Sequence, residues 1–322
     1  MAAERNNTLD LLRIVAFCGV VALHTVSPDG PLSAGLNIAS RFGVPFFFAV
    51  AGFFSLRAGR AKLRRRLAHV ARIALAAVAL YAVTTMVGLT PSFEACCGGA
   101  DYPMLGSVLW NFFVWNAYPP AYPLWFLFAL LYVYFVWMLL CERPGGMRLF
   151  CVCGACLLAA RVAVGEIGGF IAPLSDPMRS WLLTGIPSFA LGLLLRQHQD
   201  KLASWSTGFD ALMVTAGAVC AVMEAATFGL QELYVGTVIV VTGVFAAALR
   251  HPCAADARGW FAVLRCGETS MIAYVVHYAV IMLLMRWQAS TEMIRFLATC
   301  SASLLVGFVI AANAGALRRR RA

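Results

Sequence analysis

Long apolar runs constrain this chain more than any other feature of its sequence. They are continuous rather than alternating, and each is close to the roughly 20 apolar residues that cross the hydrocarbon core of a bilayer as a helix. Hydrophobic residues make up 61% of the chain and charged residues only 12%, against about 25% charged in soluble domains. In lipid, a continuous run satisfies its backbone hydrogen bonds only as a helix. The runs cover 9–26, 37–56, 73–90, 123–141, 149–164, 178–196, 207–227, 233–249, 269–287 and 293–317. We therefore expect an all-α integral membrane protein, a bundle of about ten transmembrane helices in a single domain over 1–322.

The distribution of charge predicts how the chain crosses the membrane. Nineteen of the 25 Lys and Arg residues fall in segments that ten crossings place on one side, seven of them in the 57–72 loop. The opposite loops carry the acids Asp29, Glu94, Asp101, Glu166, Asp176, Glu232 and Glu292. Cytoplasmic loops are enriched in Lys and Arg, so both termini are predicted to be cytoplasmic. This pattern explains the net charge of +10 by basic residues at the surface of the lipid bilayer, so no nucleic-acid partner is expected. The eleven cysteines follow no metal-ligand spacing, and no metal is expected.

Six arginines lie within the runs or near their outer ends, where topology does not require them. They are Arg13, Arg41, Arg161, Arg179, Arg286 and Arg295. A charge at the centre of a bilayer costs roughly 2.5–3.5 kcal/mol on insertion scales, so ionisable residues there mark functional sites or buried pairs.

The first run carries Asp10, Arg13 and His24. At 3.6 residues per turn the three side chains share one helix face, and Asp10 and Arg13 are near enough to pair. Arg13 and His24 are about 16 Å apart along the axis, with the cation near the cytoplasmic end and the imidazole near the outer end. One reading is a buried corridor for a long ligand whose charged part is cytosolic. The other is a structural ion pair and an interfacial histidine.

Five motifs in order resemble those of the membrane-bound acyltransferase-3 family. "RIVAFCGVVALH" (13–24) is similar to the Arg-to-His signature of the first helix, and "RFGVPFFFAVAGFF" (41–54) to the second helix. "PLWFLFALLYVY" (123–134) resembles the Trp-Phe-Leu helix, and "MRSWLLTGIPSFALGLLL" (178–195) the Arg and Phe-x-x-Gly segment. "SMIAYVVHYAVI" (270–281) resembles the late Tyr-x-x-His helix.

The resemblance implies a multi-pass enzyme of the plasma membrane that takes an acyl group from cytosolic acyl-CoA. Acetyl-CoA is the expected donor, and the acceptor is a hydroxyl of a cell-surface glycan or a lipid-linked sugar. His24 matches the essential His of the family and Arg13 its essential Arg. Because the unperturbed pKa of histidine, about 6.5, lies near working pH, His24 is assigned as the general base. Direct attack on the thioester and an acyl-histidine intermediate both stay open.

Further candidates follow from position. Arg41, at the expected depth of His24, is a candidate for stabilising the oxyanion or positioning the acceptor, or else an arginine that reaches the headgroups. Arg179 is a candidate for binding the acceptor. Trp125 and Tyr122 are candidates for stacking on a sugar, or belong to an aromatic belt.

His277 and Tyr274 share a helix face, and His277 is expected mid-membrane, lining the acyl-CoA tunnel or packed in the core. Arg64, Arg65 and Arg66 can bind the CoA phosphates, although a basic cytoplasmic loop needs no CoA to explain it. The alternative function is a transporter or flippase of a glycan precursor or a small amino acid. Transporters gather their binding groups at the midplane, whereas Arg13 and His24 lie at opposite depths.

Overall fold

The computed structural model describes residues 6–91, 112–113, 116, 118–168, 179–252, 265–286 and 291–320, except for the side chains at 119, 165–168 and 315–320. Within these residues the chain is all-helical, as the apolar runs predict. Many of the charges predicted in outer loops, among them Glu94, Asp101 and Asp176, lie outside the described residues. The cytoplasmic location of the termini stays a prediction.

Among the residues that the structure describes, eight helices are long and apolar enough to cross a membrane. These candidate spans are 7–25, 31–53, 60–86, 120–140, 146–164, 207–228, 266–286 and 292–314. The other two predicted crossings, 178–196 and 233–249, are also helical, but each contains a shorter regular helix. The all-α membrane fold is therefore confirmed, and about ten spans agree with it.

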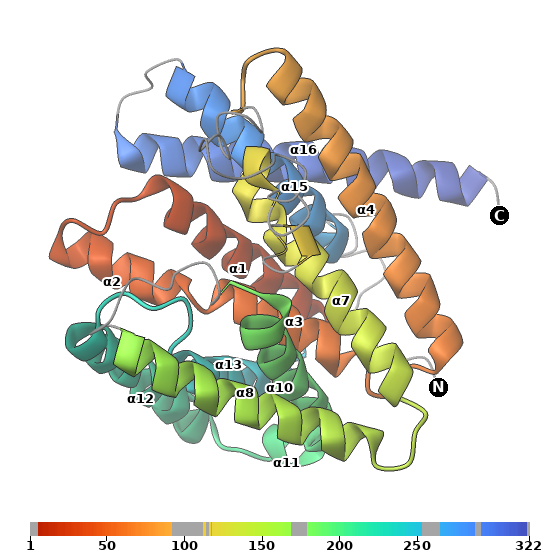
Figure 1. Cartoon of the computed structure of the whole chain (residues 1–322), viewed down its shortest axis with the longest axis vertical. Coiled ribbons are helices and arrows are strands. Elements are labelled where there is room, and N and C mark those ends of the chain that lie inside the picture. The colour runs from red at the N-terminus through yellow and green to blue at the C-terminus, as the bar shows by residue number, and fades with distance from the viewer. Residues whose placement is uncertain are drawn as a thin grey trace, which may run out of the picture. The chain divides into compact units, whose positions relative to one another are not determined.

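The helices keep the order of the predicted runs (Figure 1). In the amino-terminal half they are α1 (Asn7–Thr25), α2 (Pro31–Ser40), α3 (Gly43–Phe53), α4 (Arg60–Met86), the 3₁₀ helix η1 (Pro119–Leu124), α7 (Trp125–Leu140) and α8 (Gly146–Gly168). In the other half they are the π-helix η2 (Trp181–Gly185), α10 (Ile186–Gln197), α11 (Gln199–Ala203), α12 (Thr207–Phe228), α13 (Val235–Arg250), α15 (Cys266–Arg286) and α16 (Glu292–Arg320).

Two predicted helices are interrupted. The run 37–56 is broken at Arg41 and Phe42, where α2 ends and α3 begins. The run 178–196 opens with the π-helix η2, whose wider turn precedes α10. Such irregular backbone is tolerated at membrane depth only where protein or a cavity surrounds it, and π-helical turns are frequent at functional sites.

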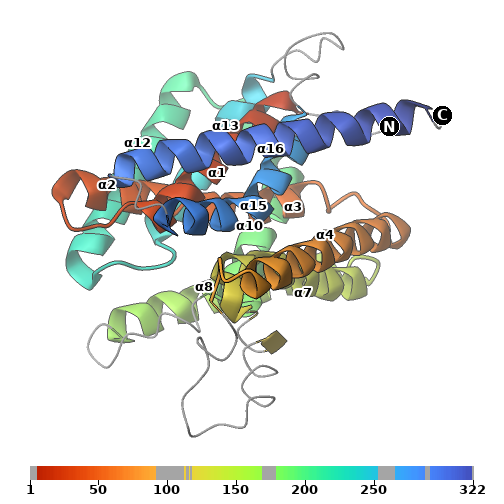
Figure 2. The same ribbon diagram turned by 90° about the horizontal axis from the view of Figure 1, so that it is seen from above.

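The residue contacts divide the chain into two compact units. The first unit comprises 1–47, 198–222 and 236–322, and the second comprises 48–197 and 223–235. In the first unit α15 and α16 pack side by side, as both views show (Figure 2). The two helices approach closely at Gly307 of α16, where an added Cβ would lie only 2.5 Å from the Thr269 carbonyl oxygen of α15.

The start of α1 is fixed within the first unit by three polar contacts. The Asn6 side-chain oxygen accepts from the Leu9 amide at 3.1 Å and caps the helix, which satisfies one of the amides that a helix start leaves free. The Asn6 side-chain amide donates to the Ala248 carbonyl at 3.0 Å, and the Thr8 hydroxyl to the His251 carbonyl at 2.7 Å. These contacts tie α1 to the end of α13 and so set its position along the axis.

The second unit is built around an aromatic core. Phe189 of α10 contacts Tyr134 and Trp137 of α7 and Phe150 of α8, with ring centroids 5.7–6.4 Å apart. Glycines let the backbones meet, since a Cβ on Gly192 would lie 1.9 Å from the Ala49 carbonyl oxygen of α3. Overpacking at such contacts is destabilising, so these positions need glycine.

Candidate active site

Asp10 and Arg13 form the expected ion pair near the start of α1. The Arg13 Nη1 and Asp10 Oδ1 atoms are 2.6 Å apart, and the two side chains are 23% and 11% exposed. Gly267 of α15 lies directly against the pair, because an added Cβ would be 2.7 Å from Arg13 Nη1 and 2.9 Å from Asp10 Oδ1. The pair is thus packed between two helices of the first unit, and the charges face the protein interior.

His24, near the end of α1, lies beside His277 of α15. The ring centroids are 5.7 Å apart, and the two rings are tilted by 36°. His277 is fully buried, and its Nδ1 is 2.5 Å from the Tyr274 carbonyl oxygen. Because a carbonyl only accepts hydrogen bonds, Nδ1 carries the proton. The buried Nε2 has no hydrogen-bond partner among the described residues.

The predicted difference in depth between His24 and His277 is wrong. Gly267 lies beside Arg13 and His277 lies beside His24, so α1 and α15 run parallel over this length. The two histidines therefore lie at the same level along the helices. The start of each helix was predicted from its own local sequence, whereas tertiary packing fixes the stagger between helices.

A pocket of about 330 Å³ opens at the His24 end of α1. It is lined by the segment 23–28, by Ile281 and Met285 of α15, and by Glu292 and Arg295 of α16. The Glu292 carboxylate accepts from the Ser27 amide at 3.0 Å and so joins α16 to the end of α1. This volume is at the low end for small-molecule sites.

The face of α1 between the ion pair and His24 is apolar. Phe17 and Val21 are fully buried, Val20 is 3% exposed, and Phe17 meets His277 edge-on at 6.1 Å. The expected buried corridor is therefore closed along this face of α1. A ligand that reaches His24 from the Arg13 end has to displace Phe17 or pass along another helix.

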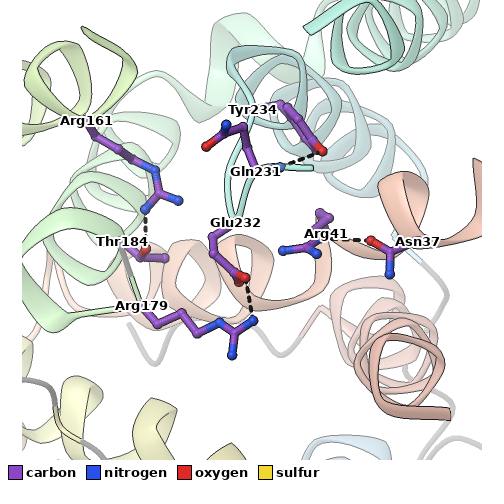
Figure 3. Close-up of polar contacts among 8 residues, drawn as sticks. All are labelled: Asn37, Arg41, Arg161, Arg179, Thr184, Gln231, Glu232 and Tyr234. Atoms are coloured by element: carbon purple, nitrogen blue, oxygen red, sulfur yellow. Dashed lines mark hydrogen bonds and ion pairs between the residues drawn. The ribbon is translucent and has the colours of Figure 1, made fainter. Parts of the chain in front are cut away.

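Arg41 lies in the break between α2 and α3. Its Nε donates to the Asn37 side-chain oxygen at 3.2 Å (Figure 3). The arginine is half-buried and is not among the residues that line the His24 pocket. Tyr274, by contrast, is buried in the ring cluster around His277, with centroids 5.4 Å apart.

The acceptor candidates lie in the second unit. Arg179 pairs with Glu232 at 2.5 Å (Figure 3) and lies over the Tyr122 ring, 5.5 Å from its centroid. Trp125 is only 9% exposed and contacts Phe48. Arg179 and Trp125 thus both contact other residues of the protein, which is what a structural role would require.

The three arginines of the basic loop differ from one another. Arg64 and Arg65 are exposed on α4. Arg66 is half-buried and donates to the Phe54 carbonyl at 2.8 Å and the Ser55 hydroxyl at 3.1 Å, just after the end of α3. Arg66 therefore satisfies a carbonyl at a helix end, and only Arg64 and Arg65 present their charge at the surface.

The sequence singled out Arg161 and Arg295 only as arginines at positions where topology does not require them, and it gave them no specific role. Arg161 of α8 is 3% exposed, and its Nη1 donates to the Thr184 hydroxyl of η2 at 2.6 Å (Figure 3). Arg295 of α16 lines the His24 pocket. Position along the sequence did not reveal which of these arginines lines the His24 pocket.

The fold and the site define a class of protein: a helical, multi-pass membrane protein with a histidine pocket near one end of its first helix. The model of the acyltransferase domain family, acyltransferase-3, matches residues 6–312, which include parts of both compact units. The chain belongs to this family and is a membrane acyltransferase by family. Comparisons with curated proteins and with solved structures gave no match.

Proposed function

We propose that the protein transfers an acetyl group from cytosolic acetyl-CoA to a hydroxyl of a cell-surface glycan or a lipid-linked sugar in the plasma membrane. The observation that carries the proposal is the pocket with His24 in its wall, on a helix whose other end holds the Asp10–Arg13 pair. The family supports acyl transfer over the transporter or flippase alternative. The modest pocket volume supports a short acyl group.

His24 acts as the general base in this proposal. Its imidazole takes the proton of the acceptor hydroxyl as the oxygen attacks the thioester carbon, a role that histidine can fill near neutral pH. His277 limits the orientations open to the His24 ring, since the two rings are adjacent and His277 is held by the Tyr274 carbonyl. His277 and Tyr274 are therefore positioning residues rather than direct ligands of the acyl donor.

Arg13 and Arg41 contribute charge in different ways. Arg13, held by Asp10 and covered by Gly267, provides a fixed cation at the end of α1 where the CoA part of the donor is proposed to bind. Arg41, at a break between two helices, is proposed to contact the acceptor. Discontinuous helices supply such polar contacts at membrane depth.

The remaining candidates bind the two ends of the substrates. Arg64 and Arg65 are proposed to hold the CoA phosphates, for which guanidinium groups are suited. Arg179 and Trp125 are proposed to position the acceptor sugar. For Arg179 this requires that the sugar contact the edge of the Arg179–Glu232 pair rather than replace Glu232, since the pair is 2.5 Å apart.

The test of the proposal is the acetyl content of surface glycans. Cells that lack the gene are complemented with wild type, His24→Ala or Arg286→Ala. Arg286 is exposed and is not among the pocket-lining residues. Mass spectrometry of released glycans and lipid-linked sugars is expected to show O-acetyl groups with wild type and Arg286→Ala. With His24→Ala they are expected to be lost, although the variant still accumulates in the membrane. Equal acetylation with His24→Ala would remove the general-base role.

A further inference from the structure

The six arginines that topology leaves unexplained differ in what they contact. Four of them pair with another side chain in the folded protein, namely Arg13 with Asp10, Arg41 with Asn37, Arg161 with Thr184 and Arg179 with Glu232. Arg286 is exposed at the end of α15. Arg295 differs, because its half-buried guanidinium makes no hydrogen bond or ion pair with any described residue.

The unpaired state of Arg295 is costly for the protein alone. The Arg295 Nε atom is buried without a hydrogen-bond partner among the described residues. Buried polar groups are normally paired, and an unmade charged hydrogen bond costs more than a neutral one. The cost falls if a bound group accepts from the guanidinium, and Arg295 lines the same pocket as His24.

Other unsatisfied groups lie near Arg295. Thr299 and Ser303 follow it at one-turn spacing on the same face of α16. Both are fully buried, and neither hydroxyl has a partner among the described residues. The buried Nε2 of His277 is likewise without one. Buried polar atoms without a hydrogen bond occur elsewhere in the described residues as well, but among them only Arg295 lines the pocket. It is therefore the one that a group bound in the pocket can satisfy.

The charge of the pocket decides what kind of ligand group Arg295 meets. Glu292 lines the same pocket, and its carboxylate is fixed by the Ser27 amide. Arg295 and Glu292 together give the pocket wall no net charge, so the pocket does not select for a permanent anion such as a sugar carboxylate. A negative charge that develops only during reaction, on one oxygen, is stabilised by a preorganised donor.

We propose that Arg295 stabilises the oxyanion of the acyl-transfer reaction. This role, which rests on the proposed function, replaces the one considered for Arg41. The acceptor oxygen bonds to the thioester carbon, its proton moves to the His24 imidazole, and the carbonyl electron pair moves to the oxygen that Arg295 contacts. When the carbonyl forms again, the carbon–sulfur bond breaks, and the CoA thiolate takes the proton from the imidazolium.

The experiment measures transfer of labelled acetyl from acetyl-CoA to endogenous acceptors in membrane vesicles, normalised to folded protein. Loss of one oxyanion donor lowers kcat about 10²–10³-fold, so Arg295→Ala is expected to lower turnover by this factor at an unchanged half-saturating acetyl-CoA concentration. Millimolar guanidinium is expected to restore part of the turnover, which a merely structural role would not allow. Arg286→Ala, the matched control, is expected to behave as wild type.

Two results would overturn the role of Arg295. One is wild-type turnover in Arg295→Ala, and the other is a change only in the half-saturating acetyl-CoA concentration. If Arg295→Ala does not fold, Arg295→Lys keeps the charge and loses the planar donors, and wild-type turnover in that variant is equally contradictory. The proposed function fails separately, if wild-type vesicles transfer no label or His24→Ala vesicles transfer as much as wild type.

Discussion

At the scale of single residues, α1 carries its charges where neighbouring helices can fix them. Asp10 and Arg13 pair at 2.6 Å against Gly267, and His24 lies beside His277. The spacing along α1 was sufficient to predict the ion pair, because three residues bring side chains together on any helix. It could not predict the contact with His277, which depends on how two helices far apart in the sequence pack.

The basic loop gives a prediction at this scale. Replacing Arg64 and Arg65 together with Gln is expected to weaken acetyl-CoA binding in detergent about tenfold, because each exposed guanidinium loses a charge-assisted hydrogen bond to phosphate. Arg66→Gln is expected instead to lower the melting temperature, since Arg66 holds the Phe54 carbonyl and the Ser55 hydroxyl. Titration of acetyl-CoA and thermal denaturation of the same preparations separate the two effects.

Unchanged acetyl-CoA affinity in the Arg64 and Arg65 double variant would show that these charges serve only to orient the chain in the membrane. The converse result for Arg66, weaker binding at an unchanged melting temperature, would place that side chain in the CoA site instead.

At the scale of helices and their contacts, the sequence predicted which segments are helical but not where they break. The run from 37 to 56 is uniformly apolar after Arg41, so hydropathy alone reads it as one helix. The break leaves Arg41 between α2 and α3. Likewise the π-helix η2 is visible only in the structure, where the Leu183 carbonyl and the Thr184 hydroxyl accept from Arg161. Tertiary hydrogen bonds of this kind have no local sequence signal.

The contact between α12 and α13 in the first unit gives the prediction at this scale. A Cβ on Gly236 would lie 2.3 Å from the Gly217 carbonyl oxygen and 2.3 Å from the Ala221 amide nitrogen. Backbone atoms cannot give way as a side-chain end can, so Gly236→Ala is expected to cost about 1–3 kcal/mol through overpacking. Gly35→Ala on α2 is the matched control, because its Cβ would meet nothing within 4 Å and alanine favours a helix. Thermal denaturation in detergent should show a lower melting temperature for Gly236→Ala alone, and equal melting of both variants would disprove this close contact.

At the scale of the whole molecule, the sequence was enough to predict an all-α membrane protein and its family, because composition and apolar run length are properties of the chain as a whole. The match over 6–312 agrees with the five motifs. Residue roles were harder to predict. Of the candidates, Asp10, Arg13, His24, Arg41, Tyr274 and His277 belong to the first compact unit, and Arg64, Arg65, Arg66, Trp125 and Arg179 to the second. Arg295 became a candidate only through its pocket, since nothing in its local sequence distinguishes it from Arg286.

The central proposal is that His24 acts as the general base when an acetyl group passes from cytosolic acetyl-CoA to an acceptor at the outer end of α1. The most direct measurement uses inside-out membrane vesicles supplied with acetyl-labelled CoA, followed by a membrane-impermeant O-acetyl esterase. Labelled product is expected to resist the esterase until detergent opens the vesicles, and His24→Ala vesicles are expected to form no such product. Labelled product on the esterase-accessible side, or equal labelling with His24→Ala, would contradict it.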